Sequence, residues 1–500
     1  MKRIAIGLLA AACMIMLSGC MPLSVNLQRA DQAVSLPVPD AGEAEPAIGD
    51  SLPSSSYYVS LYLVSSDQRA LVPVSRAVTV GPGQSLATEA LLALLSASGN
   101  ADARSPFPAG THLLNIERSG NAAVVNLSIE ARNAENEQQI FWMHQSVADT
   151  LVGLDGIEYV NVMVADRSEC PYDVPMGAQG EGGEDLAGAW AHLNADQELL
   201  GQKDGEMSPV ERNAVLYYPS RDGKYIAPVV STVSITGDDR ITPLIEALFS
   251  APEAGCLRSP FPANSSVLTA RPEIVETEAG RHMARLAFDA NLIAALERDG
   301  LNAWQTFASL TYTLTGFLPE VDGLIVLIGD GQLTRAERDG QELTFTGGEM
   351  SRASYPDAVC RLAVSYMSAS DGGLLRLERP LDRLSAVSPR AILNELFMGP
   401  AAWETGASRV LPDGVTIDDI LGIRIADGEA TVNLSSNFYR CCQSLTAQQE
   451  RNMIYAMVNS LTELQQVRAV RFQVEGETVD HLVSSLMLRG PLMRNPGLIR

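Results

Sequence analysis

The chain has 500 residues, of which 46% are hydrophobic and 19% are charged, so it has enough apolar material for several buried cores. Its 36 basic and 60 acidic residues give a formal net charge of −24. This balance argues against nucleic acid as a partner, because binding phosphates requires clustered Lys and Arg. It also argues against broad electrostatic adhesion to an anionic lipid surface.

Residues 1–20 have the pattern of a lipoprotein export signal. Lys2 and Arg3 precede an apolar run of about 14 residues, which suits a signal peptide and is short for a membrane span. The run ends at Leu17-Ser18-Gly19-Cys20, which resembles the bacterial lipobox. A plain secretory signal or an uncleaved anchor is the alternative. We expect cleavage before Cys20 and lipid on its thiol, holding the protein at the cell membrane on the extracytoplasmic face.

The rest of the chain divides into a spacer and three similar modules. Residues 21–55 are rich in Pro, Ala, Ser and acidic side chains, which predicts a flexible spacer. Each module has the predicted order β-β-α-β-β-α-β, with strands read from alternation and helices from apolar residues at i, i+3, i+4 and i+7. The expected modules are 56–167, 211–331 and 358–477. The fold class is therefore α+β, with two helices packed on a mixed β-sheet in each module.

A repeated sequence supports the division into modules. The hexapeptide Arg104–Ala109 recurs identically at Arg258–Ala263, and a looser copy occupies Ser408–Gly414. The copies lie about 150 residues apart, which is typical of one domain plus a linker. The segments between and after the modules are expected to be linkers at 168–210 and 332–357 and a tail at 478–500. Residues 342–346 are a candidate hairpin, and 482–488 are either a short docking helix or disordered.

The cysteines do not predict a disulfide framework. After Cys13 and Cys20 an odd number remains, at positions that differ between the modules: Cys170, Cys256, Cys360, Cys441 and Cys442. Adjacent cysteines bond only through a strained ring, so we expect free thiols.

Several repeated residues have both a structural and a functional interpretation. Asn126 with Ser128 and Asn433 with Ser435 follow equivalent strands, and their side chains suit turn caps better than a site. Two further pairs recur in the hexapeptides. Arg104 and Arg258 either bind an anion or stabilise the proline turn, and we favour the turn. Phe107 and Phe261 either fill the edge of the core or project from the surface as contact residues, and we favour the core.

Catalytic patterns are weak. The five histidines are His112, His144, His192, His282 and His481, and none has metal-ligand spacing. Asp238-Asp239 and Asp418-Asp419 occupy expected loops, and no nucleophile elbow or P-loop occurs. We expect no enzyme, no cofactor and no metal site, although a carboxylate pair for glycoside hydrolysis depends on distances that the sequence does not give. His144 adjoins the apolar stripe of its helix and is expected to be structural.

The third module has four motifs in order: Met398-Gly399-Pro400, Leu411–Gly414, Gly428–Ser435 and the strand that ends at Val474-Glu475-Gly476. With these motifs it resembles the GerMN domain of the GerM sporulation and spore-germination family. The other two modules resemble divergent copies. They close with Ala165-Asp166 and Gly329-Asp330, and the second replaces Asn-Leu-Ser by Ala287-Phe288-Asp289.

The resemblance implies a fold like the ring-building modules of envelope assemblies and no catalysis. We therefore expect a membrane-anchored, non-catalytic interaction or assembly scaffold, in sporulation or spore germination, with envelope proteins or further copies of itself as partners. The alternative is a module that binds peptidoglycan or another wall polymer, and a wall hydrolase is the third class.

Overall fold

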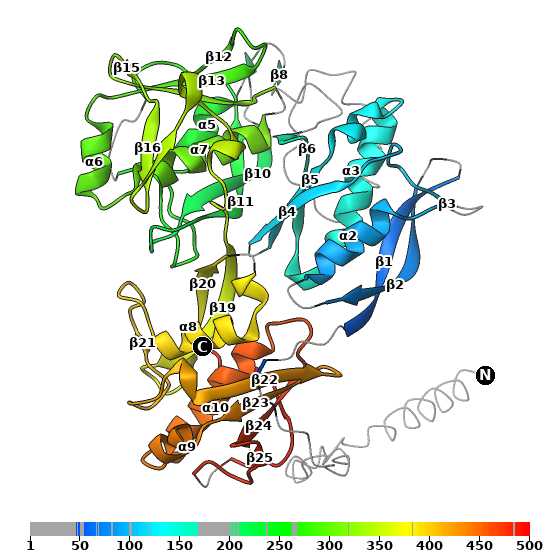
Figure 1. The fold of residues 1–500 in the computed structure, drawn as a ribbon. Coiled ribbons are helices and arrows are strands. Elements are labelled where there is room, and N and C mark those ends of the chain that lie inside the picture. Colours follow the sequence, from blue (N-terminus) through cyan, green and yellow to red (C-terminus); the bar gives the residue numbers. More distant parts are fainter. Residues whose placement is uncertain are drawn as a thin grey trace, which may run out of the picture. The chain divides into compact units, whose positions relative to one another are not determined.

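The structure is a computed structural model, and it confirms the predicted fold class of repeated α+β modules (Figure 1). It describes residues 47–500 except 48, 51–54, 67, 69, 82–83, 100–102, 120, 169–201, 204–205, 208–209, 237–238, 263–267, 319, 383 and 484–485. The predicted signal, Cys20 and Cys170 lie outside these residues. Residues 45–500 form one compact unit.

The elements follow the predicted order in each module. Module 1 contains β1 (Ser55–Ser65), β2 (Leu71–Val80), α2 (Leu86–Leu95), β3 (Ala103–Arg104), β4 (Leu113–Ser119), β5 (Ala122–Leu127), η2 (Ile129–Asn133), α3 (Glu137–Leu151), η3 (Leu154–Gly156), β6 (Tyr159–Val164) and β7 (Arg167–Ser168). A small hairpin of β8 (Gln202–Lys203) and β9 (Glu206–Met207) follows.

Module 2 contains β10 (Val210–Pro219), β11 (Ile226–Ile235), α5 (Ile241–Ala247), β12 (Glu273–Glu276), β13 (His282–Phe288), α6 (Leu292–Arg298), α7 (Ala303–Phe317), β14 (Gly323–Ile328), β15 (Gly331–Gln332), β16 (Arg335–Arg338), β17 (Gln341–Thr344), η5 (Thr346–Gly348), β18 (Glu349–Met350) and η6 (Arg352–Ser354). Module 3 contains β19 (Arg361–Ala369), β20 (Leu374–Leu381), η7 (Ser385–Val387), α8 (Pro389–Met398), β21 (Ala407–Ser408), η8 (Ile417–Asp419), β22 (Ile420–Ala426), β23 (Glu429–Leu434), α9 (Ser436–Cys442), α10 (Ala447–Leu461), β24 (Ala469–Val474), β25 (Glu477–Thr478), β26 (Leu492–Met493) and η9 (Pro496–Leu498).

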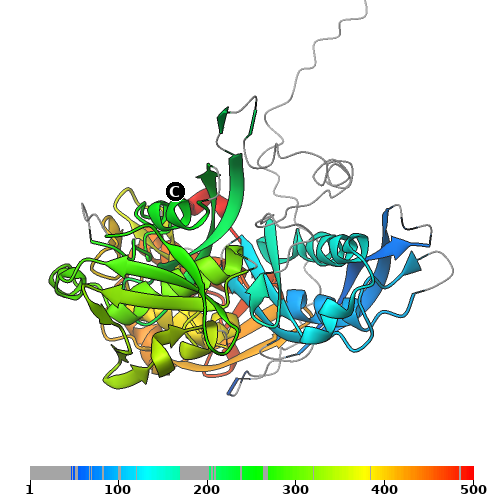
Figure 2. The same cartoon turned by 90° about the horizontal axis from the view of Figure 1, so that it is seen from above.

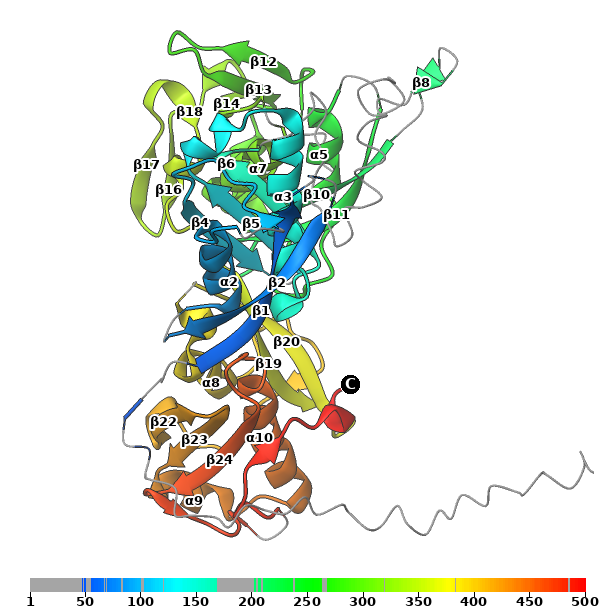
Figure 3. The ribbon, with the colours of Figure 1, turned by 90° about the vertical axis from the view of Figure 1, so that its right-hand side faces the viewer.

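The strands of each module belong to two sheets rather than to the single sheet that was expected. One sheet is built on the opening hairpin, which is β1–β2, β10–β11 or β19–β20. The other is mixed, as β4-β5-β6-β7 in module 1, β12-β13-β14-β15 in module 2 and β22-β23-β24-β25 in module 3. In each mixed sheet the second and third strands are parallel, and a parallel pair needs a crossover. The long helices α3, α7 and α10 supply it, and Figure 3 shows α10 beside β22–β24.

Hydroxyl groups of the long helix form hydrogen bonds with the backbone of the first hairpin strand. In module 1, Thr150 Oγ1 of α3 accepts a hydrogen bond from Tyr62 N of β1 at 3.0 Å, and Ser146 Oγ donates to Tyr62 O. Tyr62 is paired with Pro73 across the hairpin, and proline has no N–H to donate. The backbone groups of Tyr62 therefore face the helix, which can be followed beside the blue β1 in Figure 2, and bond to it as they would to another strand.

The same contact recurs in the other modules. Tyr217, paired with Pro228, donates its N–H to Thr313 Oγ1 at 3.0 Å, and Ser309 Oγ donates to its carbonyl. In module 3, Tyr366 N donates to Ser460 Oγ at 3.2 Å. Because a buried strand edge must satisfy its N–H and C=O groups, these helix side chains allow the hairpin to end its sheet under a helix.

The segment 332–357, expected as a linker, is part of module 2. Its hairpin β16–β17 includes most of the candidate hairpin residues, and β18 pairs with β14. Phe345, Met350 and Tyr355 are nearly inaccessible to solvent and belong to the core of module 2. The linker prediction was wrong because the polar, glycine-containing sequence conceals single apolar residues that fill this core.

The tail 478–500 and the end of the spacer are also built into the fold. Leu482 and Leu488 are fully buried in the core of module 3, and β26 pairs with β24. The residues described within 482–488 form no helix. In the spacer, Ala47, Gly49 and Asp50 bond to module 3, in contrast to the flexible spacer expected over these positions.

We predict that the third module needs its tail. Residues 358–500 should fold with one cooperative transition, whereas 358–477, the module expected from the sequence, should lose most of its stability. Burying each leucine of the pair contributes about 1.5–3 kcal/mol. Thermal unfolding followed by circular dichroism compares the fragments. In the whole chain Leu488→Ala should cost about 2–5 kcal/mol. Equal melting of both fragments would show that the tail is dispensable.

Candidate functional site

The polar groups that the fold gathers most closely lie where modules meet, and the first cluster joins modules 1 and 2. Arg352 of η6 donates from Nη1 to Glu117 Oε2 of β4 at 3.3 Å. It also donates from Nε to Thr315 Oγ1 at 3.1 Å and from Nη2 to Tyr312 O at 3.0 Å. Tyr217 OH donates to the same Glu117 oxygen at 3.0 Å. The Arg352 and Glu117 side chains are only 7% and 5% exposed, so both charges are removed from water and paired.

Two aromatic rings complete this cluster. The Arg352 guanidinium lies 4.4 Å from the ring centroid of Tyr312 and 5.5 Å from that of Tyr217. Burial alone would lower the pKa of Arg352, but Tyr217 and Glu117 beside it more than offset this, and its pKa is raised. Burial, followed by the charge of Glu117, raises the pKa of Tyr217 well above its ordinary value. The guanidinium thus stays charged and the phenol stays neutral.

Apolar and backbone contacts extend the same junction. Val124 and Met163 of module 1 belong to the hydrophobic core of module 2. Asn161 Nδ2 of β6 donates to Gly316 O of α7 at 2.7 Å, and Asn161 is 5% exposed. Modules 1 and 2 therefore share buried surface.

We predict that Arg352→Met destabilises the whole chain by about 3–5 kcal/mol, because Glu117 would stay buried without its cation. The double variant Glu117→Gln with Arg352→Met should recover part of this loss, because it leaves no unpaired charge. Chemical denaturation of the full chain measures both. Arg285→Ala is the control, since its ion pair with Glu273 is 44% and 58% exposed and should contribute about 1 kcal/mol or less. If Arg352→Met and Arg285→Ala destabilised the chain equally, the buried ion pair of Arg352 and Glu117 would not be a main contact of the junction.

The junction of modules 2 and 3 is a strand contact. Residues 358–360 run beside β11, where Ile226 N donates to Ala358 O at 2.8 Å and Cys360 N donates to Ile226 O at 3.0 Å. Val359 forms a parallel bridge with Ile226. The connection into β19 is therefore hydrogen-bonded to module 2 and not a free hinge.

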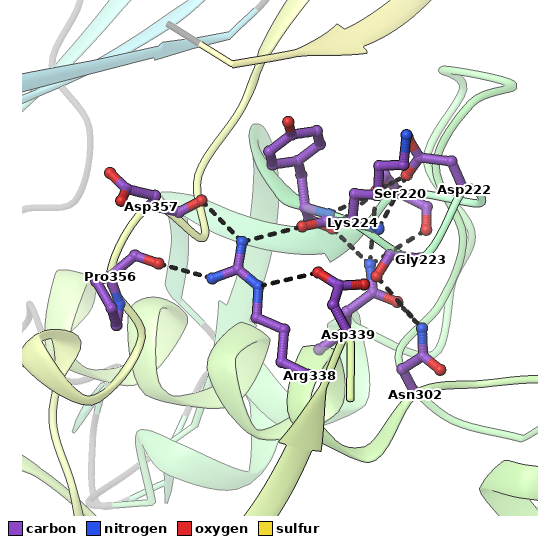
Figure 4. Close-up of polar contacts among 11 residues, drawn as sticks. Ser220, Asp222, Gly223, Lys224, Asn302, Arg338, Asp339, Pro356 and Asp357 are labelled. Atoms are coloured by element: carbon purple, nitrogen blue, oxygen red, sulfur yellow. Dashed lines mark hydrogen bonds and ion pairs between the residues drawn. The ribbon is translucent and has the colours of Figure 1, made fainter. Parts of the chain in front are cut away.

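Arg338 of β16 fastens this connection to the β10–β11 turn (Figure 4). Its guanidinium donates to Pro356 O at 2.6 Å, Asp357 O at 3.1 Å and Lys224 O at 3.3 Å. It also lies 4.5 Å from the centroid of the Trp304 ring. One cation thus holds three carbonyls from two segments more than a hundred residues apart.

Side-chain hydrogen bonds from Ser220 and Asn302 stabilise the β10–β11 turn itself. Ser220 Oγ donates to Asp222 Oδ1 at 2.5 Å and accepts from Tyr225 N at 2.9 Å, and Asn302 Nδ2 donates to Gly223 O at 3.3 Å (Figure 4). Gly223 has φ +82°, and a Cβ there would lie 2.7 Å from Asn302 Nδ2. The turn therefore requires glycine at this position.

A cavity of about 1140 Å³ opens between the modules. Its lining includes Tyr57 and Arg118 from module 1, Tyr218 and Glu253 from module 2, and Arg376 and Glu463 from module 3. Arg376 is paired with Glu378, and Glu463 with Arg494. The cavity has charged walls of both signs.

The repeated Asn and Ser residues act as turn caps, as predicted. Asn126 Oδ1 accepts from Asp166 N at 3.1 Å, and Asn433 Oδ1 accepts from Gly476 N at 2.7 Å, each in the turn after the parallel strand. Asp166 has φ +64° and Gly476 has φ +84°. Ser128 Oγ accepts from His112 N at 3.1 Å, and Ser435 Oγ caps α9 by accepting from Phe438 N at 3.0 Å.

The hexapeptides build proline turns. Ser105 and Ser259 accept hydrogen bonds from Phe107 N and Phe261 N. Phe261 is 3% exposed and stacks on Phe249 at 4.7 Å, which confirms its core position, while Phe107 is partly buried against the core of module 1. Arg258 N donates to Pro219 O at 3.0 Å, whereas Arg104 belongs to β3.

The remaining candidates are scattered. Asp419 Oδ2 accepts from Thr416 N in the capping box of η8, and Asp239 accepts from Thr242 N. Asp418 belongs to η8, whereas Asp238 and His192 lie outside the described residues. Cys256, Cys360, Cys441 and Cys442 are free thiols. Across residues 47–500, apart from the gaps in the description, no three His, Cys, Asp or Glu side chains gather to hold a metal. In the same part of the chain, no helix has the length and apolarity to cross a bilayer.

His144 of α3 is structural. It is 4% exposed, its Nε2 atom has no hydrogen-bond partner, and burial lowers its pKa to about 4. The ring is therefore neutral in the folded protein, whereas the unfolded chain takes up a proton near the ordinary value of 6.5.

We predict a loss of stability between pH 6.5 and about 4 that depends on His144. The folded pKa lies below the unfolded one, so the contribution is complete above pH 6.5 and decreases as the pH falls to the folded value, by about 3 kcal/mol at most. His144→Gln should flatten this part of the curve of unfolding free energy against pH. His112→Gln, at a side chain that is 63% exposed, is the control and should leave it unchanged. An unchanged curve in His144→Gln would contradict a buried neutral ring.

The sequence did not identify the groups at the module junctions. Arg352 and Arg338 lie in the segment expected as a linker, and nothing local marks them. Glu117 offered only a weak signal, as a charged residue within the segment that forms β4.

Comparison with known proteins gives a family match. The profile of the Germane family, described as "Sporulation and spore germination", matches residues 60–169, 215–334 and 365–480, together more than half of the chain. Each repeat is matched separately, as the sequence resemblance predicts.

Two solved structures are similar to parts of the chain. The tandem GerMN domains of the sporulation protein GerM from Bacillus subtilis are 18% identical, cover 58% of this chain and 98% of their own, and have a TM-score of 0.23. The first GerMN domain of the same protein is 17% identical, covers 27% of this chain and 97% of its own, and has a TM-score of 0.22. No curated protein matches the chain in sequence.

Proposed function

This chain belongs to the Germane family of sporulation and spore germination, and we propose that it is a lipid-anchored scaffold of the cell envelope that acts by binding and not by catalysis. The lipobox that ends at Cys20 supports the anchor on the extracytoplasmic face of the cell membrane. The partners of the scaffold are envelope proteins or further copies of the chain.

The main support for this proposal is that buried or half-buried charged side chains bond one module to another. Arg352, Glu117 and Arg338 bond protein groups at the junctions, where they hold modules together. A body with bonded junctions presents its outer strands and helices at fixed spacings, which suits a scaffold. The family description sets the biological process, and the binding role is our inference.

One strand edge suits strand addition by a partner protein. The corresponding strands of the three modules are β4, β12 and β22. β4 lies against β11 and β19, and Leu421 of β22 accepts a backbone hydrogen bond from Gly49. β12 pairs with β13 and has no second strand partner within the described part of the chain. Its Ile274 is 40% exposed, so this edge combines unpaired backbone with an apolar side chain.

Binding of wall polymer is the less favoured role. Sugar recognition uses exposed aromatic side chains gathered in a groove, and the exposed aromatic residues of the described chain are Tyr58 and Tyr439, in different modules. Purified peptidoglycan is therefore included in the test as a competing ligand.

We predict that crosslinking in intact membranes, followed by capture of the tagged chain, recovers defined envelope proteins or a second copy. Ile274→Lys should reduce this yield severalfold, because a charge on the β12 edge opposes strand addition. Cys20→Ala should release the chain from membranes or block its processing, and lose the same crosslinks. Glu246→Lys, an exposed change on α5, is the matched control and should keep the yield.

Two outcomes would overturn the proposal. One is normal cleavage and membrane retention of Cys20→Ala, which would exclude the lipid anchor. The other is hydrolysis of purified peptidoglycan that disappears with a single carboxylate substitution, which would make the protein an enzyme. Sedimentation with peptidoglycan in the absence of protein crosslinks would favour the polymer-binding role instead.

A further inference from the structure

Module 3 holds a short piece of the chain that precedes module 1. Ala47 is 1% exposed, and its backbone is bonded on both sides by side chains of the mixed sheet. Ala47 N donates to Gln473 Oε1 at 3.2 Å, and Asn433 Nδ2 donates to Ala47 O at 3.0 Å. Asn433 and Gln473 are 3% and 0% exposed. Two buried amide side chains thus bond the N–H and the C=O of one residue.

The next contacts bind the backbone of Gly49 and the carboxylate of Asp50. Gly49 N donates to Leu421 O at 3.3 Å. The Asp50 carboxylate accepts from Arg390 Nε at 2.7 Å and from Arg390 Nη2 at 2.9 Å, in a bidentate pair, and Oδ1 also accepts from Ile423 N at 3.1 Å. Hydrogen bonding from Arg390 is the main reason why the pKa of Asp50 is lowered. A planar guanidinium is selective for a carboxylate in this arrangement.

A glycine makes room for the segment. The pairing of β22 with β23 shifts between Ile420 and Gly422, and a Cβ on Gly422 would lie 2.4 Å from Gly49 O and 2.6 Å from Ala47 O. No Cβ contact is that short, so any larger residue would displace the segment or move the strand.

The contacts are specific to module 3. Module 1 has the same strand shift, but Asn115 stands where module 3 has Gly422. Met163 replaces Gln473 beside the shared Asn, and Ala87 replaces Arg390 as the second residue of the helix. Module 2 has Ala287 and Leu327 at the Asn433 and Gln473 positions. One module in three therefore carries the amide pair, the arginine and the gap.

We propose that module 3 contains a peptide-binding site whose ligands are the chain's own residues Ala47, Gly49 and Asp50, bound in cis, so that the lipid tether is fastened to the third module before the chain enters the first. From Asp50 to Ser55 the chain has five residues to span, at most about 18 Å when fully extended. The bound segment therefore also ties the start of β1 to module 3. This fastening follows from the contacts alone and does not depend on the partner of the scaffold.

The test is hydrogen–deuterium exchange of the full chain, read at peptides that cover residues 47–50 and Ile423. Both should be protected in the wild type. Asp50→Ala should raise exchange at both by about five- to tenfold, since the ion pair is about one third exposed and partly screened. Arg390→Ala should do the same, and the double variant should add little, because both single variants break one interaction. Asp50→Glu should retain part of the protection.

A second measurement shows that the site recognises a peptide. A labelled peptide of residues 44–52 should bind the Asp50→Ala chain, whose own segment has left the site, and should bind the wild-type chain at least tenfold more weakly. The same peptide with Ala in place of Asp should not bind. Arg376→Ala is the matched control, because it removes an exposed ion pair of module 3 and should change neither exchange nor peptide binding.

Three results would overturn the proposal. Unchanged exchange at residues 47–50 in both single variants would mean that the contacts do not hold the segment. Failure of the peptide to bind an opened chain would mean that module 3 has no peptide site. Protection that disappears on dilution, together with a dimer by mass, would mean that the segment binds the module 3 of a second copy rather than its own.

Discussion

The architecture of each module depends on how the open edge of its first strand is satisfied. Tyr62, Tyr217 and Tyr366 direct backbone groups away from their hairpin partners, and serine or threonine hydroxyls of the long helix take those hydrogen bonds. The helix is thereby placed across the strand edge and fixed along its length. That position divides the strands between two sheets and leaves the mixed sheet free to accept neighbours on its own edges.

The three copies share this constraint and diverge where their neighbours differ. Modules 1 and 3 keep the buried asparagine that holds the turn after the parallel strand, whereas module 2 has Ala287 and a turn of Gly329-Asp330. Module 2 instead adds the segment from β16 to η6, whose residues fill its core and supply both arginines of the junctions, Arg338 in β16 and Arg352 in η6. Of the three modules, module 3 has a glycine, Gly422, where residues Ala47 and Gly49 from before module 1 approach the strand. The repeat is therefore one scaffold carrying three different sets of contacts.

How far the sequence predicted this structure depends on the range of the interactions. Periodicity located α3, α7 and α10, because their apolar stripes repeat within a few residues. The Asn and Ser caps were found because the same residues recur at the same position in modules 1 and 3. The ordered segment 332–357 was missed, since its short strands contain few apolar residues. The junctions were missed because Arg352 and Glu117 are 235 residues apart, and Asp50 and Arg390 are 340 apart. No local pattern marks either pair.

The separation of Arg352 and Glu117 along the chain also sets an order of events during synthesis. Chains grow at about 5–20 residues per second, so Arg352 appears roughly 12 to 47 s after Glu117. During that interval the carboxylate lacks the Arg352 guanidinium, and the cost of burying its charge keeps its face of β4 in contact with water. The first module can form its own core early, but its shared face closes only when the second module is complete. Assembly of the pair is therefore timed by the last turn of module 2.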